Sequence, residues 1–398
     1  MAPPSLRQYL DCCATTPLAP EVAARMAVVQ AQAWGNPSSL HGFGLAAAEQ
    51  LERSRQVMAA LLGCHNERLV FTSGGSESIH LALLGSAPAL ELTSPSGDVP
   101  RLLISAVEHP ASRAAAAALQ QRGWLVQEVP VDRLGVIDFE AFERLLAPPT
   151  RLVSLIWGQS EVGTIQPVDR IAALCRSAGV LVHLDAVQVL GHQPLRLGEL
   201  PVDLLSFAAH KIQGPRGVGA VVVKPGVQLQ PCIGGGGQEG GMRSGTEAVA
   251  LVAGFEAALQ LATDRLAAHG GHDPVAPLRD ALAAELLALP GVELSGPDPR
   301  EAGQPARLPH HLSLLVRAGG GDWLNGRQLV QALWREGFAC SSGSACSSSG
   351  SAASSVLLAM GYETSAAAAG LRISLGAWHG SELLDQFPQA LERARAAL

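Results

Sequence analysis

The sequence of 398 residues has no excess of positive charge, no long uninterrupted apolar run and no regular cysteine pattern. Its net charge of -7 argues against nucleic-acid binding, because contacts to phosphates require a basic surface. Charged residues, glycine or proline interrupt the apolar stretches before they reach membrane-spanning length, so we expect no membrane association. The N-terminal residues 1–11 lack the basic and apolar regions of a signal peptide, which predicts a cytoplasmic protein.

The seven cysteines are odd in number and their spacing matches no disulfide framework. The sequence has no C-x-x-C motif and no Cys/His cluster, so we expect no metal site. In a reducing compartment most of these cysteines would be free thiols, and such thiols are commonly buried and inert. We interpret Cys340 in this way.

Short apolar segments alternate with helical patterns over the first two thirds of the chain. We expect seven strands, at 69–72, 102–106, 124–129, 152–157, 180–184, 203–207 and 218–223. Helical patterns precede or separate several of them, at 44–62, 111–122, 138–147 and 166–178. This alternation predicts an α/β fold with a large, mostly parallel, seven-stranded sheet that helices cover on both faces. The last two strands are too close for a helical crossover, which predicts one antiparallel strand.

A second pattern follows a long helix that we expect at 246–270. Three more helices are expected at 275–289, 326–337 and 381–397, and strands around 292–295 and 311–316. We therefore predict a large domain over 18–262 and a smaller α+β domain made of 1–17 and 263–398. Within the smaller domain, the Ser/Gly/Ala-rich segment 341–355 is typical of a mobile loop.

Distinctive polar residues follow four of the predicted strands, at the sheet edge where α/β proteins bind ligands. The turn at 73–76 suits a phosphate, although short glycine-rich turns are often only structural. His109 is suited to stacking on a flat ring or to proton transfer; the alternative is a histidine that only forms hydrogen bonds within a turn. Asp185 suits pairing with a buried cationic ring nitrogen, and an N-cap role is the common alternative.

Lys211 lies between two apolar strands, so we expect its side chain to point into the crevice at the sheet edge. Desolvation there lowers the pKa of a lysine and suits a covalent bond to a carbonyl carbon. A single lysine near glycines is more commonly solvated. A phosphate turn, a histidine, an aspartate and a lysine at strand ends, in this order, nevertheless form a specific set.

In these residues and in the motifs around them, the sequence resembles the class V aminotransferase-like enzymes that use pyridoxal phosphate (PLP). Within them it is similar to the cysteine desulfurases of the iron–sulfur-assembly and nitrogen-fixation type. The similarity covers nearly the whole chain and rests on LDCCATTP (10–17), GNPSSLH (35–41), FTSGGSES (71–78), AVEHP (106–110), EVGTIQP (161–167), HLDAVQ (183–188), HKIQGPRGVGA (210–220), GGGGQEGGMRSGTE (234–247), SSGSACSS (341–348) and LRISLG (371–376).

The resemblance implies a PLP-dependent transferase fold, like that of aspartate aminotransferase. It also implies conversion of L-cysteine to L-alanine, with the sulfur left as a persulfide on Cys346. A sulfur-acceptor or iron–sulfur scaffold protein would then receive that sulfur, for the synthesis of iron–sulfur clusters or other sulfur-containing cofactors. The implied catalytic residues are Cys346, Lys211, which would hold PLP covalently, and His109, which would stack on the ring and transfer a proton.

The other implied residues bind the cofactor or the substrate. The cofactor would contact Lys211, Asp185, Gln188, His109, Gly75, Ser76, His210 and Thr246. Thr246 would reach the phosphate of a neighbouring subunit, which implies a homodimer with shared active sites. Arg372 would hold the substrate carboxylate with its forked guanidinium, and Ser160 would lie beside the substrate.

The sequence departs from the family pattern at four places. Ser160 replaces an asparagine, Ala208 replaces a serine that binds phosphate, and His80 replaces an amide. The segment after Cys346 also lacks the usual Glu-Pro. These departures predict weaker cofactor retention or a slower rate. The changes at Ser160 and Ala208 leave a non-catalytic paralogue that serves as a binding partner as one alternative, and the resemblance itself leaves a selenocysteine lyase or another class V PLP enzyme as others.

Overall fold

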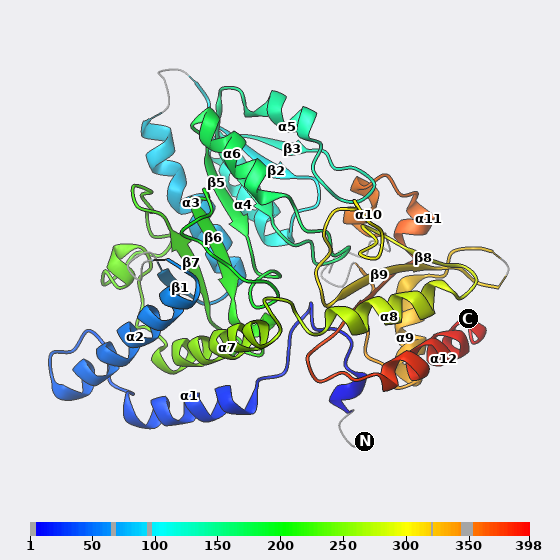
Figure 1. The fold of residues 1–398 in the computed structure, drawn as a ribbon. Helices are drawn as coiled ribbons and strands as arrows, with labels where there is room; N and C mark the ends of the chain where they lie inside the picture. Colours follow the sequence, from blue (N-terminus) through cyan, green and yellow to red (C-terminus); the bar gives the residue numbers. More distant parts are fainter. Residues whose placement is uncertain (1–4, 65–68, 94–97, 320, 344–352) are drawn as a thin grey trace.

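The computed structural model describes residues 5–64, 69–93, 98–319, 321–343 and 353–398. Its centre is a seven-stranded sheet with the strand order β1-β7-β6-β5-β4-β2-β3 (Figure 1). The strands are β1 (Leu69–Thr72), β2 (Arg101–Ser105), β3 (Leu125–Val129), β4 (Thr150–Ile156), β5 (Leu181–Asp185), β6 (Leu204–Ala208) and β7 (Gly219–Val223). Only β7 runs antiparallel to its neighbours in this sheet as described. The predicted α/β fold and its single antiparallel strand are confirmed.

Helices cover both faces of this sheet, because alternate strand residues point to opposite sides. Leu205 packs in one apolar cluster with residues of the first group of helices, and the adjacent Leu204 packs with the second group. The first group comprises α1 (Pro20–Gln32), α2 (Gly42–Leu61), α5 (Phe139–Leu146), α6 (Val168–Ala178) and α7 (Val249–Ala268). The second comprises α3 (Gly75–Leu92) and α4 (Pro110–Gln121).

A smaller unit follows, built on a three-stranded antiparallel sheet with the order β10-β9-β8. Its elements are α8 (Ala276–Leu287), β8 (Val292–Leu294), β9 (His311–Val316), α9 (Gly326–Arg335), α10 (Ser355–Ala359), α11 (Thr364–Ala367), β10 (Gly370–Ser374) and α12 (Glu382–Ala396). Cys340 packs in the core of this unit, as expected of an inert thiol. The predicted domain limit at 262/263 falls inside α7, and the division into domains stays a prediction.

The N-terminal segment connects the two units (Figure 1). The backbone N–H of Leu10 donates to Ala339 of the smaller unit at 2.8 Å, and that of Thr16 donates to His210 of the larger unit at 2.9 Å. Three 3-10 turns complete the described elements: η1 (Leu6–Gln8), η3 (Ala209–Lys211) and η4 (Glu239–Gly241). Within the described ranges, no helix has the length and apolar character needed to cross a membrane.

Candidate active site

The strand order brings the predicted site residues to one edge of the large sheet. Asp185 is the last residue of β5, and Lys211 ends the short turn η3 that follows β6. His109 follows β2 as the N-cap of α4, and Gly75 follows β1 as the first residue of α3. Because β1, β2, β5 and β6 run in the same direction, their carboxyl ends lie along the same edge.

Asp185 has a buried carboxyl group whose negative charge the described protein groups neutralise only weakly. Its side chain is 4% exposed, and its Oδ1 accepts the backbone N–H of Val187 at 3.0 Å. In the described part of the chain it has no ion-pair partner within 4.0 Å. Burial raises the pKa of Asp185, while the charges of His109 and Lys211 act in the opposite direction. A buried carboxylate of this kind requires a cation, and the site is therefore suited to a cationic ring nitrogen.

Lys211 extends toward the N-terminal segment. Its Nζ donates to the carbonyl oxygens of Cys13 and, at 2.8 Å, of Ala14. Gln188 donates from Nε2 to the same carbonyl of Cys13 at 2.9 Å. The sequence alone predicts no role for Cys13 and Ala14. The only signal that points to them is the segment LDCCATTP, and nothing in that motif connects it with the lysine.

His109 is fixed by its position at the start of α4. Its Nδ1 accepts the backbone N–H of Ala111 at 3.1 Å, so the proton of the neutral ring lies on Nε2. Burial lowers the pKa of His109, and the charge of Lys211 acts in the same direction, against that of Asp185. A neutral imidazole with an oriented Nε2 is suited both to stacking and to proton transfer.

Glu108 has a second buried carboxyl group, next to the carboxyl ends of β2 and β4. Oε1 of Glu108 accepts from the hydroxyl of Ser105 at 2.7 Å and from the backbone N–H of Ile156 at 2.8 Å. Burial raises the pKa of Glu108 to about 7, against those hydrogen bonds. Glu108 therefore links the end of β2 to the end of β4, and it was missed because the sequence offers no sign of which β4 backbone group would face it.

The turn before α3 has the close backbone approach of an anion-binding loop. Gly74 has φ +150°, a value that favours glycine, and it provides no side-chain cap for the helix. A Cβ on Gly219 would lie 2.7 Å from the Cα of Gly74, so β7 packs directly against the turn. A Cβ on Gly75 would lie 3.0 Å from Cγ2 of Val187. The uncapped N–H groups of α3 are thus available to an anion.

Other predicted phosphate ligands lie around this turn. Ser76 is exposed in the first turn of α3. Nδ1 of His210 lies 3.2 Å from the hydroxyl of Thr15, and burial lowers the pKa of His210 to about 4. Ala208, at the end of β6, would lie with its Cβ 3.6 Å from a Cβ on Gly75. The position that lacks the expected serine therefore faces the turn itself.

Arg372 lies on β10 of the smaller unit, 5% exposed. Its Nη2 donates to Oδ1 of Asp11 at 2.8 Å, and its Nη1 donates to the backbone carbonyl of Ser160 at 3.2 Å. Among the described residues its Nε has no partner. Ser160 thus meets Arg372 through its backbone. Glu161, whose pKa burial raises to about 7, accepts at 2.6 Å from Ser354.

Two predicted site residues are not joined to this cluster. Thr246 is exposed and lines a pocket with Trp34 and Asn36, near the start of α7. Cys346 lies outside the described residues.

His80, one of the departures from the family pattern, contacts its own helix, with Nδ1 2.8 Å from the carbonyl oxygen of Ser76. Within the described ranges, no group of three or more His, Cys, Asp or Glu side chains is arranged to hold a metal ion.

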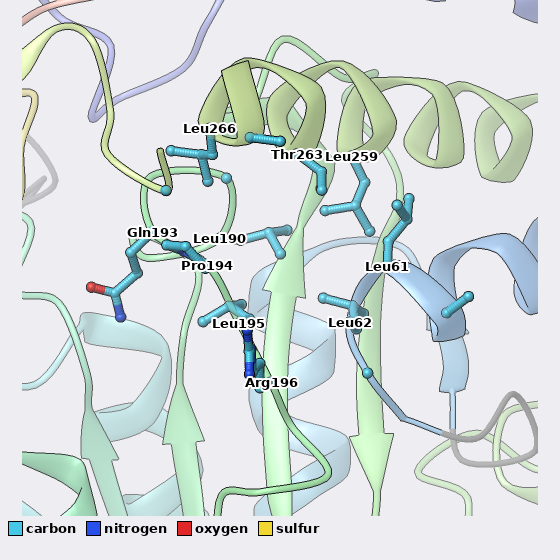
Figure 2. A pocket seen from close by; sticks show the side chains of 15 residues that line it. Leu61, Leu62, Leu190, Gln193, Pro194, Leu195, Arg196, Leu259, Thr263 and Leu266 are labelled. Carbon is cyan, nitrogen blue, oxygen red and sulfur yellow. The ribbon is translucent and has the colours of Figure 1, made fainter. Parts of the chain in front are cut away.

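A separate pocket of about 310 Å³ contains none of the predicted site residues (Figure 2). Leucines from the end of α2, from α7 and from the loop after β5 point into it. Its lining is apolar apart from a few groups such as Thr263 and Arg196. It offers neither the buried carboxylate nor the amine that the sheet edge provides.

Comparison with known proteins agrees with this geometry. A family model described as aminotransferase class-V matches residues 8–387. This chain belongs to the class-V aminotransferase family. A cysteine desulfurase of Cereibacter sphaeroides is 38% identical over 397 residues, which cover 98% of this chain and 97% of that protein.

Two solved structures extend the likeness to the fold. The structure of a NifS-like protein has a TM-score of 0.87 at 33% identity, covering 99% of this chain and 100% of its own. The structure of SspA in complex with cysteine has a TM-score of 0.78 at 26% identity, covering 94% of this chain and 100% of its own. The predicted class V resemblance and fold are confirmed.

Membership of this class-V family implies PLP, and the residues present fit that cofactor. Asp185 offers a buried carboxylate for a cationic ring nitrogen, and the turn around Gly75 offers backbone N–H groups for a phosphate. Lys211 supplies an amine at the same sheet edge, bound in this structure to two backbone carbonyls.

Proposed function

We propose that this protein is a PLP-dependent cysteine desulfurase that converts L-cysteine to L-alanine and receives the sulfur on Cys346. The observation that carries the proposal is the full-length similarity to a cysteine desulfurase at 38% identity, together with Lys211, Asp185 and His109 at one sheet edge. The complex of the similar protein SspA with cysteine supports the same substrate.

When bound, PLP supplies an electron sink for the pair released at the substrate Cα. The residues of this chain control where protons and charges are held. The Asp185 carboxylate stabilises a cation at the inner end of the site. The Nζ of Lys211 is the base that takes the α-proton, and the backbone carbonyls of Cys13 and Ala14 are placed to accept from the resulting ammonium group. The neutral ring of His109 transfers a proton at Nε2.

Arg372 holds the substrate carboxylate in this proposal. Its guanidinium already makes two charge-assisted contacts, to Asp11 and to the carbonyl of Ser160, which fix its plane. The Nε that has no partner among the described residues leaves further donor capacity for a carboxylate. A planar, oriented guanidinium binds a carboxylate with two parallel hydrogen bonds and so sets the direction of the substrate.

The proposed sulfur transfer needs only the substrate L-cysteine and the thiol of Cys346. The Cys346 thiolate attacks the substrate sulfur, an S–S bond forms, and the C–S bond breaks with its electron pair left on carbon. That carbon then takes the proton that Cys346 lost. The sum is L-cysteine plus a Cys346 thiol giving L-alanine plus a Cys346 persulfide, with no other oxidant or reductant. A sulfur-acceptor or iron–sulfur scaffold protein then removes the outer sulfur atom.

We propose further that two chains form a homodimer through the surface around Trp34, Leu40 and Phe43. These side chains are 60%, 92% and 61% exposed, and the rings of Trp34 and Phe43 lie 5.2 Å apart. Exposed apolar groups gathered in this way are typical of a protein–protein contact. Thr246 lines the neighbouring pocket with Trp34, which supports its role toward the site of a second subunit.

The proposed activity is tested by measuring alanine and sulfide released from L-cysteine in the presence of a reductant. We expect the two products in equal amounts from the wild-type protein. The variant Cys346→Ala is expected to lose at least about 1,000-fold in rate, as enzymes do when a nucleophile is removed. The matched variant Cys232→Ala removes an exposed thiol outside the site and is expected to keep the wild-type rate. Equal rates in the wild-type and Cys346→Ala proteins would refute the assignment of the nucleophile. The cytoplasmic location stays a prediction of the sequence.

A further inference from the structure

A chain of contacting side chains leads away from the thiol of Cys13; His310 and Asp273 are buried, and His192 is partly buried. The Sγ of Cys13 lies 3.3 Å from Nε2 of His310. The ring of His310 stacks on that of His192, with centroids 3.7 Å apart and planes 16° from parallel. The Nδ1 of His192 lies 2.7 Å from Oδ2 of Asp273. These four residues are called the Cys13–Asp273 array below.

The protonation of the array follows from its burial. Cys13 and His310 are 2% and 1% exposed. Burial raises the pKa of the Cys13 thiol and lowers the pKa of His310 well below its ordinary value, so both groups are neutral. The contact between Sγ of Cys13 and Nε2 of His310 is therefore a hydrogen bond between two neutral groups, and its donor depends on the tautomer of His310.

The other end of the array is anionic. Asp273 is 3% exposed. Burial favours the neutral form of its carboxyl group, but the hydrogen bond and charge of His192, the charge of Arg265 and the backbone N–H of Val275 together lower the pKa of Asp273. The carboxylate therefore accepts Nδ1–H of His192 and holds that ring against His310.

Packing alone does not account for an imidazole at position 310. The Nδ1 of His310 is buried and has no partner within the described ranges. An unsatisfied buried polar atom is a cost that an apolar side chain of similar size would avoid. The contacts that distinguish His310 from such a side chain are those to the Cys13 thiol and to the His192 ring.

The array reaches the site through the backbone of Cys13. The N–H of Cys13 donates to the hydroxyl of Ser374 at 2.8 Å, and its thiol is hydrogen-bonded to His310. With these two groups held, the carbonyl oxygen points in one direction, where Lys211 and Gln188 donate to it. His192 and Asp273 also line a cavity of about 20 Å³ with Lys211, so the array borders the lysine on a second side.

We propose that Cys13 and His310 are positioning residues for Lys211, which fix the carbonyl oxygen that receives its amine, while His192 and Asp273 hold His310 in place. The proposal rests on the proposed role of Lys211. Neither residue exchanges atoms with the substrate. Their effect is on where the lysine nitrogen lies and on how strongly its charged form is stabilised.

The test uses the PLP-loaded enzyme and a pH titration of the absorbance of its bound PLP. A carbonyl that accepts from a charged nitrogen favours that charge, so loosening the carbonyl shifts the titration midpoint to lower pH. We expect Cys13→Val and His310→Leu to shift it by about half a unit or more. The other titratable groups near Lys211 that stay in place in both variants include Asp185, His109 and His210 and, across the small cavity, His192, Asp273 and Arg265.

Kinetics on L-cysteine provide the second readout. We expect kcat to fall about 10-fold in both variants, because a small displacement of a reacting group has a large effect on rate. KM should stay within about twofold, since Arg372 is untouched. Cys13→Ser keeps a donor toward His310 and should restore most of both properties. Cys175→Val makes the same replacement in a buried thiol of the large core and should change neither.

Unshifted midpoints in Cys13→Val and His310→Leu, or the same shift in Cys175→Val, would overturn the proposal. A Cys13→Ser enzyme that behaves like Cys13→Val would also overturn it.

Should the apolar variants fail to fold, Asp273→Asn removes the anion that holds His192, and a smaller shift of the titration midpoint in the same direction is expected. An unshifted Asp273→Asn midpoint would then count against the array. A wild-type enzyme that binds PLP but forms no alanine from cysteine would refute the proposed function and leave this titration valid.

Discussion

The Nη2 of Arg372 lies 2.8 Å from Oδ1 of Asp11, across 361 positions of sequence. This ion pair joins β10 of the smaller unit to the N-terminal segment that also holds Lys211. The guanidinium is thereby fixed at the edge of the large sheet before any substrate binds. Its orientation is the basis of the first prediction.

Arg372→Lys is expected to raise KM for L-cysteine about 10- to 100-fold, equivalent to one lost charged hydrogen bond of about 1.5–3 kcal/mol. A lysine keeps the charge but not the planar fork. PLP binding, followed by its absorbance, should be retained. Arg335→Lys at the exposed end of α9 is the control and should leave KM unchanged. A wild-type KM in Arg372→Lys would exclude a carboxylate-binding role.

Much of the fold followed from the sequence because each buried strand is a short apolar run. The strand at 69–72 was placed at its exact limits, and the other six were within two residues of the observed ones. β10 was missed because Gly370 and Arg372 interrupt its apolar pattern, and the burial of Arg372 depends on distant partners, Asp11 and the carbonyl of Ser160. α1 was also not predicted.

The site was predictable where it depends on strand ends and not where it depends on distant contacts. Asp185, His109 and Lys211 follow strands whose direction the pattern fixes. The acceptors of the Lys211 amine could not be predicted, because the carbonyl of Cys13 lies 198 positions away and is a backbone group. The stacking of His192 on His310 likewise joins the two units through contacts that neither local pattern encodes.

Glu108 makes the stability of the protein depend on pH. Its pKa is about 7 in the folded protein, against an ordinary value of 4.5, so the folded state binds this proton more tightly than the unfolded state. Its contribution is therefore fully present below pH 4.5 and is lost as the pH rises through about 7. The loss amounts to about 3 kcal/mol at most.

Glu108→Gln is accordingly expected to reduce the fall in thermal unfolding midpoint between pH 5 and pH 8, measured on the PLP-free protein. Glu140→Gln, on the exposed face of α5, serves as the control and should show the wild-type fall. The same pH dependence in Glu108→Gln as in the wild type would show that this carboxyl group does not titrate between the folded and unfolded states.

Ala208→Ser is expected to strengthen PLP binding. Ala208 is buried, and its Cβ faces the turn at Gly75. A hydroxyl there adds one hydrogen bond to a charged group, worth roughly 1.5 kcal/mol at the low end, or about a 10-fold lower Kd. Equilibrium dialysis measures the change. Ala209→Ser, one residue later and equally buried, should not lower the Kd, and an unchanged Kd in Ala208→Ser would place the phosphate elsewhere.

Leu40→Asp is expected to dissociate the proposed homodimer, because it puts a charge into an apolar contact. Light scattering should give twice the 41.2 kDa chain mass for the wild type and a shift toward one chain for the variant. Leu92→Asp replaces a leucine that is 85% exposed on α3 and should remain dimeric. A Leu40→Asp protein with the wild-type mass would move the interface away from this surface.

In the proposed reaction, sulfur is transferred from L-cysteine to Cys346 at a PLP site that contains Lys211. The most direct measurement is a single turnover without reductant, followed by mass analysis of the cysteine-containing peptides and by alanine quantification. We expect one alanine per site and one added sulfur atom on the peptide that carries Cys346, with neither product in Lys211→Ala. Alanine formed without sulfur on that peptide, or sulfur found on another of the seven cysteines, would contradict it.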